Sequence, residues 1–278
     1  MTTILIANNA AALSAANPTV TVEAEFGDTV VEGSTQTLAH HGSRSGNPCP
    51  CLCLNAWEED PDAVIGVSHM DLDTLGGVMA VMGIKPHAPE FWETAAEVDV
   101  KGVHKLLEIT RDEVILEALC AFWAFSESHR VFPPRDGTVA DVTSEFTEFF
   151  EALAQILAGD AELLEAGRQW AVNVAELDCS SWVGSADGVL LRSSKYFVNH
   201  LYNPSEEIIV AFNTTHKTVT LSSANPSTAG FSCGEVVQAL WGPQAGGRAG
   251  IAGSPRRKEM TMTDARKLWH HVRHLLKE

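Results

Sequence analysis

The stretch 68–77, "SHMDLDTLGG", decides the fold. It follows the run 62–67, which is rich in Val and Ile and is typical of a buried strand. Beyond it, residues 75–84 ("LGGVMAVMGI") predict a helix, and the two glycines allow that helix to pack closely against the strand. A buried strand that leads directly into a helix is the unit from which α/β domains are built.

The residues before this stretch repeat the alternation of strand and helix. Strands are predicted within 3–7 ("TILIA"), 19–26 ("TVTVEAEF") and 33–43 ("GSTQTLAHHGS"), with a short Ala-rich helix between the first two. Because strands that alternate with helices usually form parallel sheets, we expect an α/β fold with a mainly parallel sheet and flanking helices.

The rest of the chain predicts a helical connector and a second, smaller α+β domain. Residues 89–167 carry apolar side chains at helical spacing, interrupted by a loop at 131–137. One apolar stripe there predicts core packing; its members are Phe146, Phe149, Phe150, Leu153, Ile156 and Leu157. From residue 180 on, three strand-like runs are followed by two helices. The predicted domains are an α/β domain over 1–130, a helical connector over 131–179 and an α+β domain over 180–278.

Composition and charge exclude several classes of partner. The net charge of −17 argues against binding to long duplex nucleic acid, which requires many phosphates to be neutralised. No apolar run approaches the roughly 18 residues of a membrane helix, and the first residues lack the basic opening of a signal peptide. We therefore expect a cytoplasmic protein that does not bind membranes. Eight of the 19 Lys and Arg residues fall between Arg248 and Lys277, a basic region suited to a small anionic ligand.

The stretch that decides the fold also contains the strongest chemical candidates. His69, Asp71 and Asp73 alternate at the carboxyl end of the predicted strand, where open α/β sheets bind ligands. If the strand geometry persisted, the three side chains would point to one side. Two carboxylates so close repel each other unless a cation neutralises them, which favours a hard divalent ion such as Mn²⁺ or Mg²⁺. The alternative is structural, with Asp71 or Asp73 as the N-cap of the following helix.

Further candidates lie elsewhere in the N-terminal half. His40 and His41 end another strand-like run, and Asp99 stands in an otherwise apolar context. Asp28 and His104 are weaker candidates for the same site. Each has a structural alternative, because a paired His is often half-exposed and an Asp before a helix is usually a cap.

The six cysteines are too few for a disulfide scaffold in a chain of 278 residues. Three of them form the cluster "CPCLC" at 49–53. Zinc sites usually space their ligands as Cys-x2-Cys with a second pair elsewhere, and no second pair is present. We favour apolar packing for this cluster and keep a metal or redox role as the alternative.

A Gly-rich loop near the C-terminus could bind an anion. Its glycines would let backbone N–H groups approach a phosphate, and nearby arginines would add forked donors. The candidate substrate-binding residues are Gly246, Gly247, Arg248, Gly250, Arg256 and Arg257. A flexible turn is the alternative interpretation of the same glycines.

Several of these motifs resemble those of the DHH phosphoesterase superfamily. "DLDTLGGVMAV" (71–81) is similar to its Asp-x-Asp-Ala/Thr-Ile/Leu-Gly-Ser signature, "AHHG" (39–42) to its Asp-His-His motif, and "AAEVDVKG" (95–102) to its isolated metal-binding Asp. "GPQAGGRAGIAGSPRR" (242–257) resembles the glycine loop of the associated DHHA1 substrate domain. The superfamily includes manganese-dependent pyrophosphatases, exopolyphosphatases, RecJ-like exonucleases and short-oligonucleotide phosphatases.

The chain departs from the family pattern at identifiable positions. The His-His pair precedes the His-x-Asp-x-Asp run, which reverses the usual order, and His69 is closer to Asp71 than in the common spacing. Ala39 stands where the first Asp of Asp-His-His would be, and Arg248 replaces the loop histidine.

The resemblance implies a metal-dependent phosphoesterase whose substrate lies in a cleft between a metal-binding domain and a substrate-binding domain. It implies one or two Mn²⁺ or Mg²⁺ ions held by His40, His41, His69, Asp71, Asp73 and Asp99, with Asp73 and His41 as catalytic residues. The substrate would be a small phosphorylated molecule or a short oligonucleotide. Two alternatives stay open: a non-catalytic descendant that binds a phosphorylated ligand, and a zinc hydrolase of a non-phosphate bond. The sequence leaves open whether the chain forms a homodimer.

Overall fold

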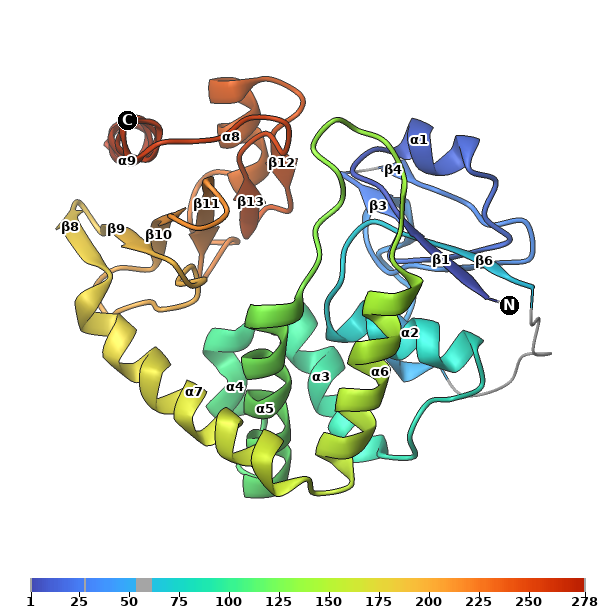
Figure 1. Ribbon diagram of the computed structural model, residues 1–278. Helices are drawn as coiled ribbons and strands as arrows, with labels where there is room; N and C mark the ends of the chain where they lie inside the picture. The colour runs from blue at the N-terminus through green and yellow to red at the C-terminus, as the bar shows by residue number, and fades with distance from the viewer. Residues whose placement is uncertain (1, 28, 54–61, 278) are drawn as a thin grey trace. The chain divides into compact units, whose positions relative to one another are not determined.

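The computed structural model describes residues 2–27, 29–53 and 62–277, and these pack as two compact units (Figure 1). The first unit comprises the chain up to Lys101 together with Lys105–Ala171. The second comprises Gly102–His104 and the chain from Val172 on. Each unit has its own sheet and its own buried core. The functional domains expected over 1–130, 131–179 and 180–278 remain predictions.

The first unit is built on a five-stranded sheet in the order β5-β2-β6-β1-β7. Its strands are β1 (Thr3–Ile6), β2 (Val20–Val22), β5 (Gln36–Leu38), β6 (Val64–Val67) and β7 (Ala140–Asp141). Four of them run parallel, and only β7 pairs with β1 in the antiparallel direction. A two-stranded hairpin, β3 (Glu25–Phe26) and β4 (Thr29–Val30), follows β2. The expected α/β fold with a mainly parallel sheet is confirmed.

Helices cover this sheet and supply most of the core. They are α1 (Ala10–Ala15), α2 (Leu72–Val81), α3 (Pro89–Lys101), α4 (Leu106–Ile109), α5 (Glu113–His129), α6 (Thr143–Leu157) and the first half of α7 (Ala161–Ser180). Short 3-10 turns lie at Gly42–Arg44, Pro50–Leu52 and Val103–Lys105. The predicted apolar stripe of α6 is buried from Phe146 to Ile156, because it faces the same core as α2 and β1. The expected helical character of 89–167 and the loop at 131–137 are likewise observed.

Two glycines of α2 let a 3-10 turn and a strand lie against the helix without side chains between them. A Cβ atom on Gly76 would lie 2.6 Å from Cys51 Cβ and 2.9 Å from Cys51 Cα. A Cβ atom on Gly77 would lie 2.7 Å from both Pro50 Cβ and Val22 Cγ1. The turn Pro50–Leu52 can therefore dock on α2 only because both positions lack a side chain.

The second unit has a six-stranded sheet in the order β12-β13-β11-β10-β9-β8. The strands are β8 (Trp182–Ala186), β9 (Val189–Ser194), β10 (Ile208–Asn213), β11 (Thr218–Ser223), β12 (Gly246–Gly247) and β13 (Ile251–Gly253). Helices α8 (Cys233–Trp241) and α9 (Met262–Leu275) bury their apolar faces against it. The Gly-rich segment that the sequence suggested as a loop is a hairpin, because β12 and β13 pair with each other.

None of the helices in the described part of the chain combines the length and apolar character that crossing a membrane requires.

Replacing Gly76 by Ala should lower the free energy of unfolding. Alanine favours a helix over glycine by roughly 1 kcal/mol, but the new methyl group would collide with the Cys51 backbone. Overpacking of this kind lowers the free energy of unfolding by about 1–3 kcal/mol, which should exceed the gain in helix propensity. Urea unfolding measures the difference. Gly46→Ala, where a Cβ meets nothing within 4 Å, is the control and should change stability by less than about 0.5 kcal/mol. Equal stability of the two variants would contradict the close-packing account.

Candidate metal centre

Three parallel strands end at the same edge of the first sheet and deliver polar residues there. Val22 of β2 is in register with Leu38 of β5 and with Val67 of β6. The next residues along each strand therefore emerge side by side, as expected at the ligand-binding edge of an open α/β sheet. They are Glu23, the segment Ala39–His41 and the segment Ser68–Asp71.

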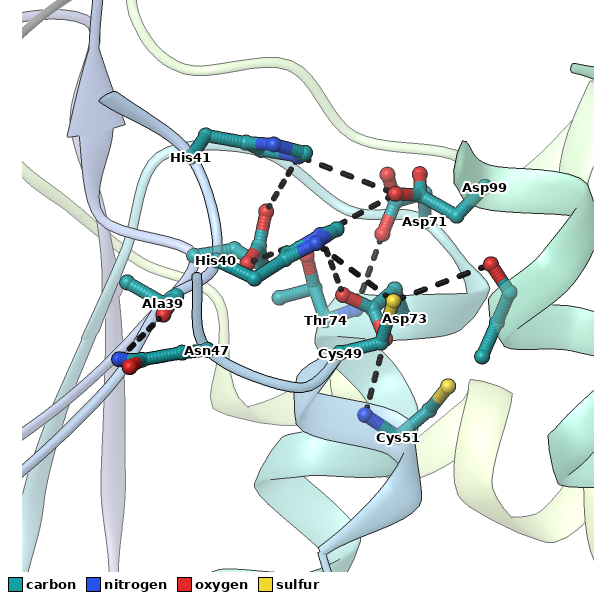
Figure 2. Close-up of polar contacts among 12 residues, drawn as sticks. Ala39, His40, His41, Asn47, Cys49, Cys51, Asp71, Asp73, Thr74 and Asp99 are labelled. Carbon is teal, nitrogen blue, oxygen red and sulfur yellow. Dashed lines mark hydrogen bonds and ion pairs between the residues drawn. The ribbon is translucent and has the colours of Figure 1, made fainter. Parts of the chain in front are cut away.

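His40 lies at the centre of the polar group and is buried, with 6% of its surface exposed. Its Nε2 atom is 3.1 Å from Asp99 Oδ2 and 3.3 Å from Asp73 Oδ2. The ring of His41 packs on that of His40, with the ring centroids 3.7 Å apart. Figure 2 shows the two imidazoles turned toward the Asp73 and Asp99 carboxylates.

Glu23 adds a carboxylate that the sequence analysis did not identify as a candidate. It is 1% exposed, and its two oxygens lie 3.7 Å from His40 Nε2 and 3.5 Å from His41 Nε2. Its φ angle of 48° is in the left-handed region, which a residue with a side chain rarely adopts. Hydrogen bonds hold this conformation, because Glu23 N–H donates to Leu38 O and the Ser68 hydroxyl donates to Glu23 O. Strain of this kind is typical of functional sites.

The two aspartates reach the cluster from different helices. Asp73 is in the first turn of α2, and its Oδ1 accepts a hydrogen bond of 2.9 Å from Cys51 N–H. That bond exists because Gly76 and Gly77 allow the Cys51 turn to dock on α2. Asp99 lies near the end of α3, and its Oδ2 is also 3.7 Å from His41 Nε2.

The donor atoms of this cluster fit a divalent metal ion. One atom each from His40, Cys49, Asp73 and Asp99 lies within 4.8 Å of the others, and Glu23, His40 and His41 form a second such group. Three of these buried atoms make no hydrogen bond of ordinary geometry: Glu23 Oε1, His40 Nε2 and Asp73 Oδ2. Buried polar atoms that converge without hydrogen bonds are unusual in folded proteins, and a shared cation would satisfy all of them.

Electrostatics support the same conclusion. Burial, followed by the charges of Asp73 and Glu25, raises the pKa of Glu23 to about 11. Burial also raises the pKa of Asp73. Burial alone would lower the pKa of His40, but Asp73 and Asp99 outweigh it and raise that pKa to about 12. Without a cation the cluster therefore retains protons, and a metal ion would bind by replacing them.

His69 and Asp71, both predicted as ligands, form a separate pair beside the cluster. His69 Nε2 is 2.9 Å from Asp71 Oδ2, and its Nδ1 is 2.7 Å from the Ser68 hydroxyl. Asp71 is the N-cap of α2 and accepts a hydrogen bond from Thr74 N–H, so the structural alternative holds for this residue. Burial opposes its ionisation, yet His69 and that N–H hold the pKa of Asp71 well below its usual range.

His69, Asp71 and Asp73 would share one side only if strand geometry persisted, and it does not, because the strand ends at Val67 and helix α2 begins at Leu72. Asp71 and Asp73 therefore have different partners. Asp71 nevertheless lies close enough for its charge to raise the pKa of Glu23 and of Asp73. A role for His69 and Asp71 as metal ligands stays a prediction.

The remaining candidates from the sequence are His104, Asp28 and Cys49. His104 belongs to the second unit, where its ring packs edge-on against Tyr202 with centroids 4.9 Å apart. Asp28 lies outside the described residues. Cys49, for which we favoured apolar packing, is buried with its Sγ atom 3.5 Å from His40 Nδ1. The structure thus adds Glu23, and it places Cys49, for which a metal role was the alternative, among the donors of the cluster. An acid at the end of an alternating apolar run was the one available signal for Glu23.

The predicted substrate-binding residues lie in the second unit, at two ends of one strand. Gly246 and Gly247 form β12, and Arg248 and Gly250 are in the turn that leads into β13. Arg256 and Arg257 are in the turn after β13. Gly247 has a packing reason to be glycine, since a Cβ there would lie 2.4 Å from Ile251 O. The flexible-turn interpretation is therefore wrong at this residue, and anion binding by the loop stays a prediction.

Comparison with known proteins gives distant likeness among solved structures. No family model and no curated protein sequence matches the chain. Among solved structures, a pGpG-specific phosphodiesterase, PggH from Vibrio cholerae, is similar to it. The two share 11% sequence identity with a TM-score of 0.41, over 93% of this chain and 98% of that chain. A likeness at this level transfers neither residues nor activity, so the function has to be inferred from the site itself.

Replacing Glu23 by Gln should stabilise the metal-free protein. Glu23 takes up a proton on folding, because its folded pKa of about 11 lies above the ordinary value of 4.5. Its contribution to stability is complete below pH 4.5 and is lost as the pH rises toward about 11. Gln needs no proton, so at about pH 8 the chelator-treated variant should exceed wild type by at least about 1 kcal/mol. Unfolding by urea across about pH 6 to about pH 9 measures this.

The same variant should respond less to metal, because one carboxylate is lost from the cluster. The shift in melting temperature on adding Mn²⁺ or Zn²⁺ should be smaller than in wild type. Glu32→Gln is the matched control, since Glu32 is an exposed partner of Arg44, and it should retain both the wild-type pH profile and the metal response. Equal metal-induced stabilisation of Glu23→Gln and wild type would show that Glu23 is not part of a metal site.

Proposed function

We propose that this chain is a divalent-metal-dependent phosphoester hydrolase. The observation that carries the proposal is the convergence of buried carboxylates and imidazoles at the carboxyl edge of the first sheet. The similarity of the segments 71–81, 39–42 and 95–102 to DHH phosphoesterase motifs supports it independently, because all three segments contribute a residue to this cluster.

The proposed metal ligands are Asp73, Asp99, His40, His41 and Glu23. When bound, the ion would supply Lewis-acid polarisation of a phosphoryl oxygen and lower the pKa of an attacking water. Mn²⁺ suits a set that mixes carboxylates with imidazoles better than Mg²⁺, which prefers oxygen ligands alone. His69 and Asp71 stand beside the cluster and complete the proposed site.

Two residues are assigned catalytic roles. Asp73 is fixed by Cys51 N–H through Oδ1, which directs its other oxygen into the cluster. The Nε2 atom of His41 faces Glu23 and Asp99 in the same cluster. We assign His41 the role of holding, through Nε2, the ion that would polarise the phosphoryl oxygen.

The proposed substrate is a small phosphorylated molecule or a short oligonucleotide. The net charge of −17 disfavours long nucleic acid, and the basic residues from Arg248 to Lys277 provide for a compact anion. Gly246, Gly247, Arg248, Gly250, Arg256 and Arg257 are the proposed phosphate-binding residues. Catalysis at amide bonds with zinc is the second candidate, because the Cys49 thiol beside His40 is a ligand type that zinc accepts.

Replacing Asp73 by Asn tests the proposed function. The amide preserves the acceptor for Cys51 N–H but removes the charge that would hold the ion. With Mn²⁺ present, we expect wild type to cleave bis(p-nitrophenyl) phosphate or short 5′-phosphorylated oligonucleotides, and the variant to lose at least about 100-fold in kcat. Steady-state assays with Mn²⁺, Mg²⁺ and Zn²⁺ in turn measure this.

Asp112→Asn is the matched control for that assay, because Asp112 caps α5 with hydrogen bonds to Val114 and Ile115 N–H and is not part of the cluster. It should retain wild-type activity. Wild-type rates in Asp73→Asn, or no cleavage of any phosphoester with any of the three ions, would contradict the proposed function. Cleavage of amides with Zn²⁺ alone would favour the second candidate.

A further inference from the structure

Cys49 occupies a position in the cluster that packing alone does not explain. Its Sγ atom is 3.5 Å from His40 Nδ1, and it belongs to the group with Asp73 and Asp99 whose donor atoms lie within 4.8 Å of one another. The residue is buried, with 5% of its surface exposed. Figure 2 shows the thiol beside the His40 ring and the Asp73 carboxylate.

Cys51, two residues away, shows what a packing cysteine looks like in the same turn. Its Sγ atom donates to Trp92 O, as that of Cys49 does to Ala96 O, but the Cβ atom of Cys51 fits the space left by Gly76. Its thiol is absent from both groups of candidate ligands among the described residues. Cys49 is the N-cap of the 3-10 turn Pro50–Leu52, whereas Cys51 lies within that turn.

Cys49 changes the ion that the cluster would select. Carboxylates alone suit Mg²⁺ and Mn²⁺, whereas thiolates select softer ions. A set of one thiolate, one imidazole and two carboxylates suits Zn²⁺ or Fe²⁺, and Mg²⁺ does not tolerate the sulfur. His40 Nε2 faces Asp73 Oδ2 and Asp99 Oδ2 in the same group, in which one donor atom of each residue lies within 4.8 Å of the others.

We propose that Cys49 is a thiolate ligand of the metal centre and makes it selective for Zn²⁺ or Fe²⁺ over Mg²⁺. This inference rests on the metal centre of the proposed function and specifies its ion. On binding, the Cys49 S–H bond breaks, an Sγ–metal bond forms, and the proton leaves to solvent. No oxidation state changes in this step.

Cobalt is the probe that tests the proposal, because Co²⁺ occupies zinc sites and a cobalt–thiolate bond absorbs in the near ultraviolet. Chelator-treated wild-type protein titrated with Co²⁺ should develop this charge-transfer band with saturation at the stoichiometry of the site. Cys49→Ser and Cys49→Ala should bind Co²⁺ without the band. Their affinity for Zn²⁺ should fall by more than about 10-fold, whereas their affinity for Mg²⁺ should change little.

Cys53→Ser is the matched control, because Cys53 ends the same turn and lies outside the candidate ligand groups; it should retain the band and the Zn²⁺ affinity. Circular dichroism of the metal-free variants checks their folding. If a variant fails to fold, the presence or absence of the thiolate band in the wild-type spectrum still tests the proposal. Saturable Co²⁺ binding to wild type without the band would overturn the role of Cys49 while leaving the metal centre intact. No Co²⁺ binding at all would overturn both. If wild type shows the thiolate band but cleaves no phosphoester, the proposed function is contradicted and the role of Cys49 stands.

Discussion

The structure of the first unit depends on an electrostatic constraint at the carboxyl edge of its sheet. Three carboxylates, from Glu23, Asp73 and Asp99, are directed at the Nε2 atom of His40 in a place from which water is largely excluded. Buried like charges cannot coexist unless protons or a cation neutralise them. Burial and neighbouring carboxylates raise the pKa of Glu23, and Asp73 and Asp99 raise the pKa of His40 against the effect of burial, so without an ion the cluster holds protons at neutral pH.

Two features of the surrounding fold bring these groups together, although each of them is unfavourable for the local backbone. Glu23 adopts a left-handed backbone, and two glycines in the middle of α2 forgo helix propensity. Both features serve the same site. The glycines admit the turn that fixes Asp73 through Cys51 N–H and presents the Cys49 thiol, and the backbone of Glu23 turns its carboxylate inward. Local rules are broken where a site requires it, as is common in functional proteins.

Much of the fold could be predicted from the sequence because its signals are local. The buried run before His69, the alternating apolar residues before Glu23 and the apolar stripe of α6 each specify an element and the side it buries. The hairpin β12–β13 was missed because its strands are two and three residues long and are set by pairing with each other and with β11. Glycines give no sequence signal for such pairing, because they have no side chains that could alternate between apolar and polar along the strand.

The site was predictable only in part. The residue types of His40, His41, Asp73 and Asp99 indicate metal binding from sequence alone, and the two histidines also follow a predicted strand. Whether Asp71 and Asp73 face the same way depends on the residue at which strand geometry gives way to a helix, and boundaries are the least certain feature of a sequence. Cys49 and Glu23 enter the cluster through tertiary contacts. For Cys49 these are the contacts of the adjoining turn, Pro50 and Cys51, with Gly77 and Gly76; for Glu23 they are hydrogen bonds with Leu38 and Ser68. No spacing rule contains that information.

The most direct test of the metal centre is an anomalous difference map from crystals grown or soaked with Zn²⁺ or Mn²⁺. The account predicts a peak within coordination distance of His40 Nε2, Asp73 Oδ2 and Asp99 Oδ2. These donors face one another, because His40 Nε2 lies 3.3 Å from Asp73 Oδ2 and 3.1 Å from Asp99 Oδ2. A map with no peak at this edge of the sheet at saturating metal would contradict it.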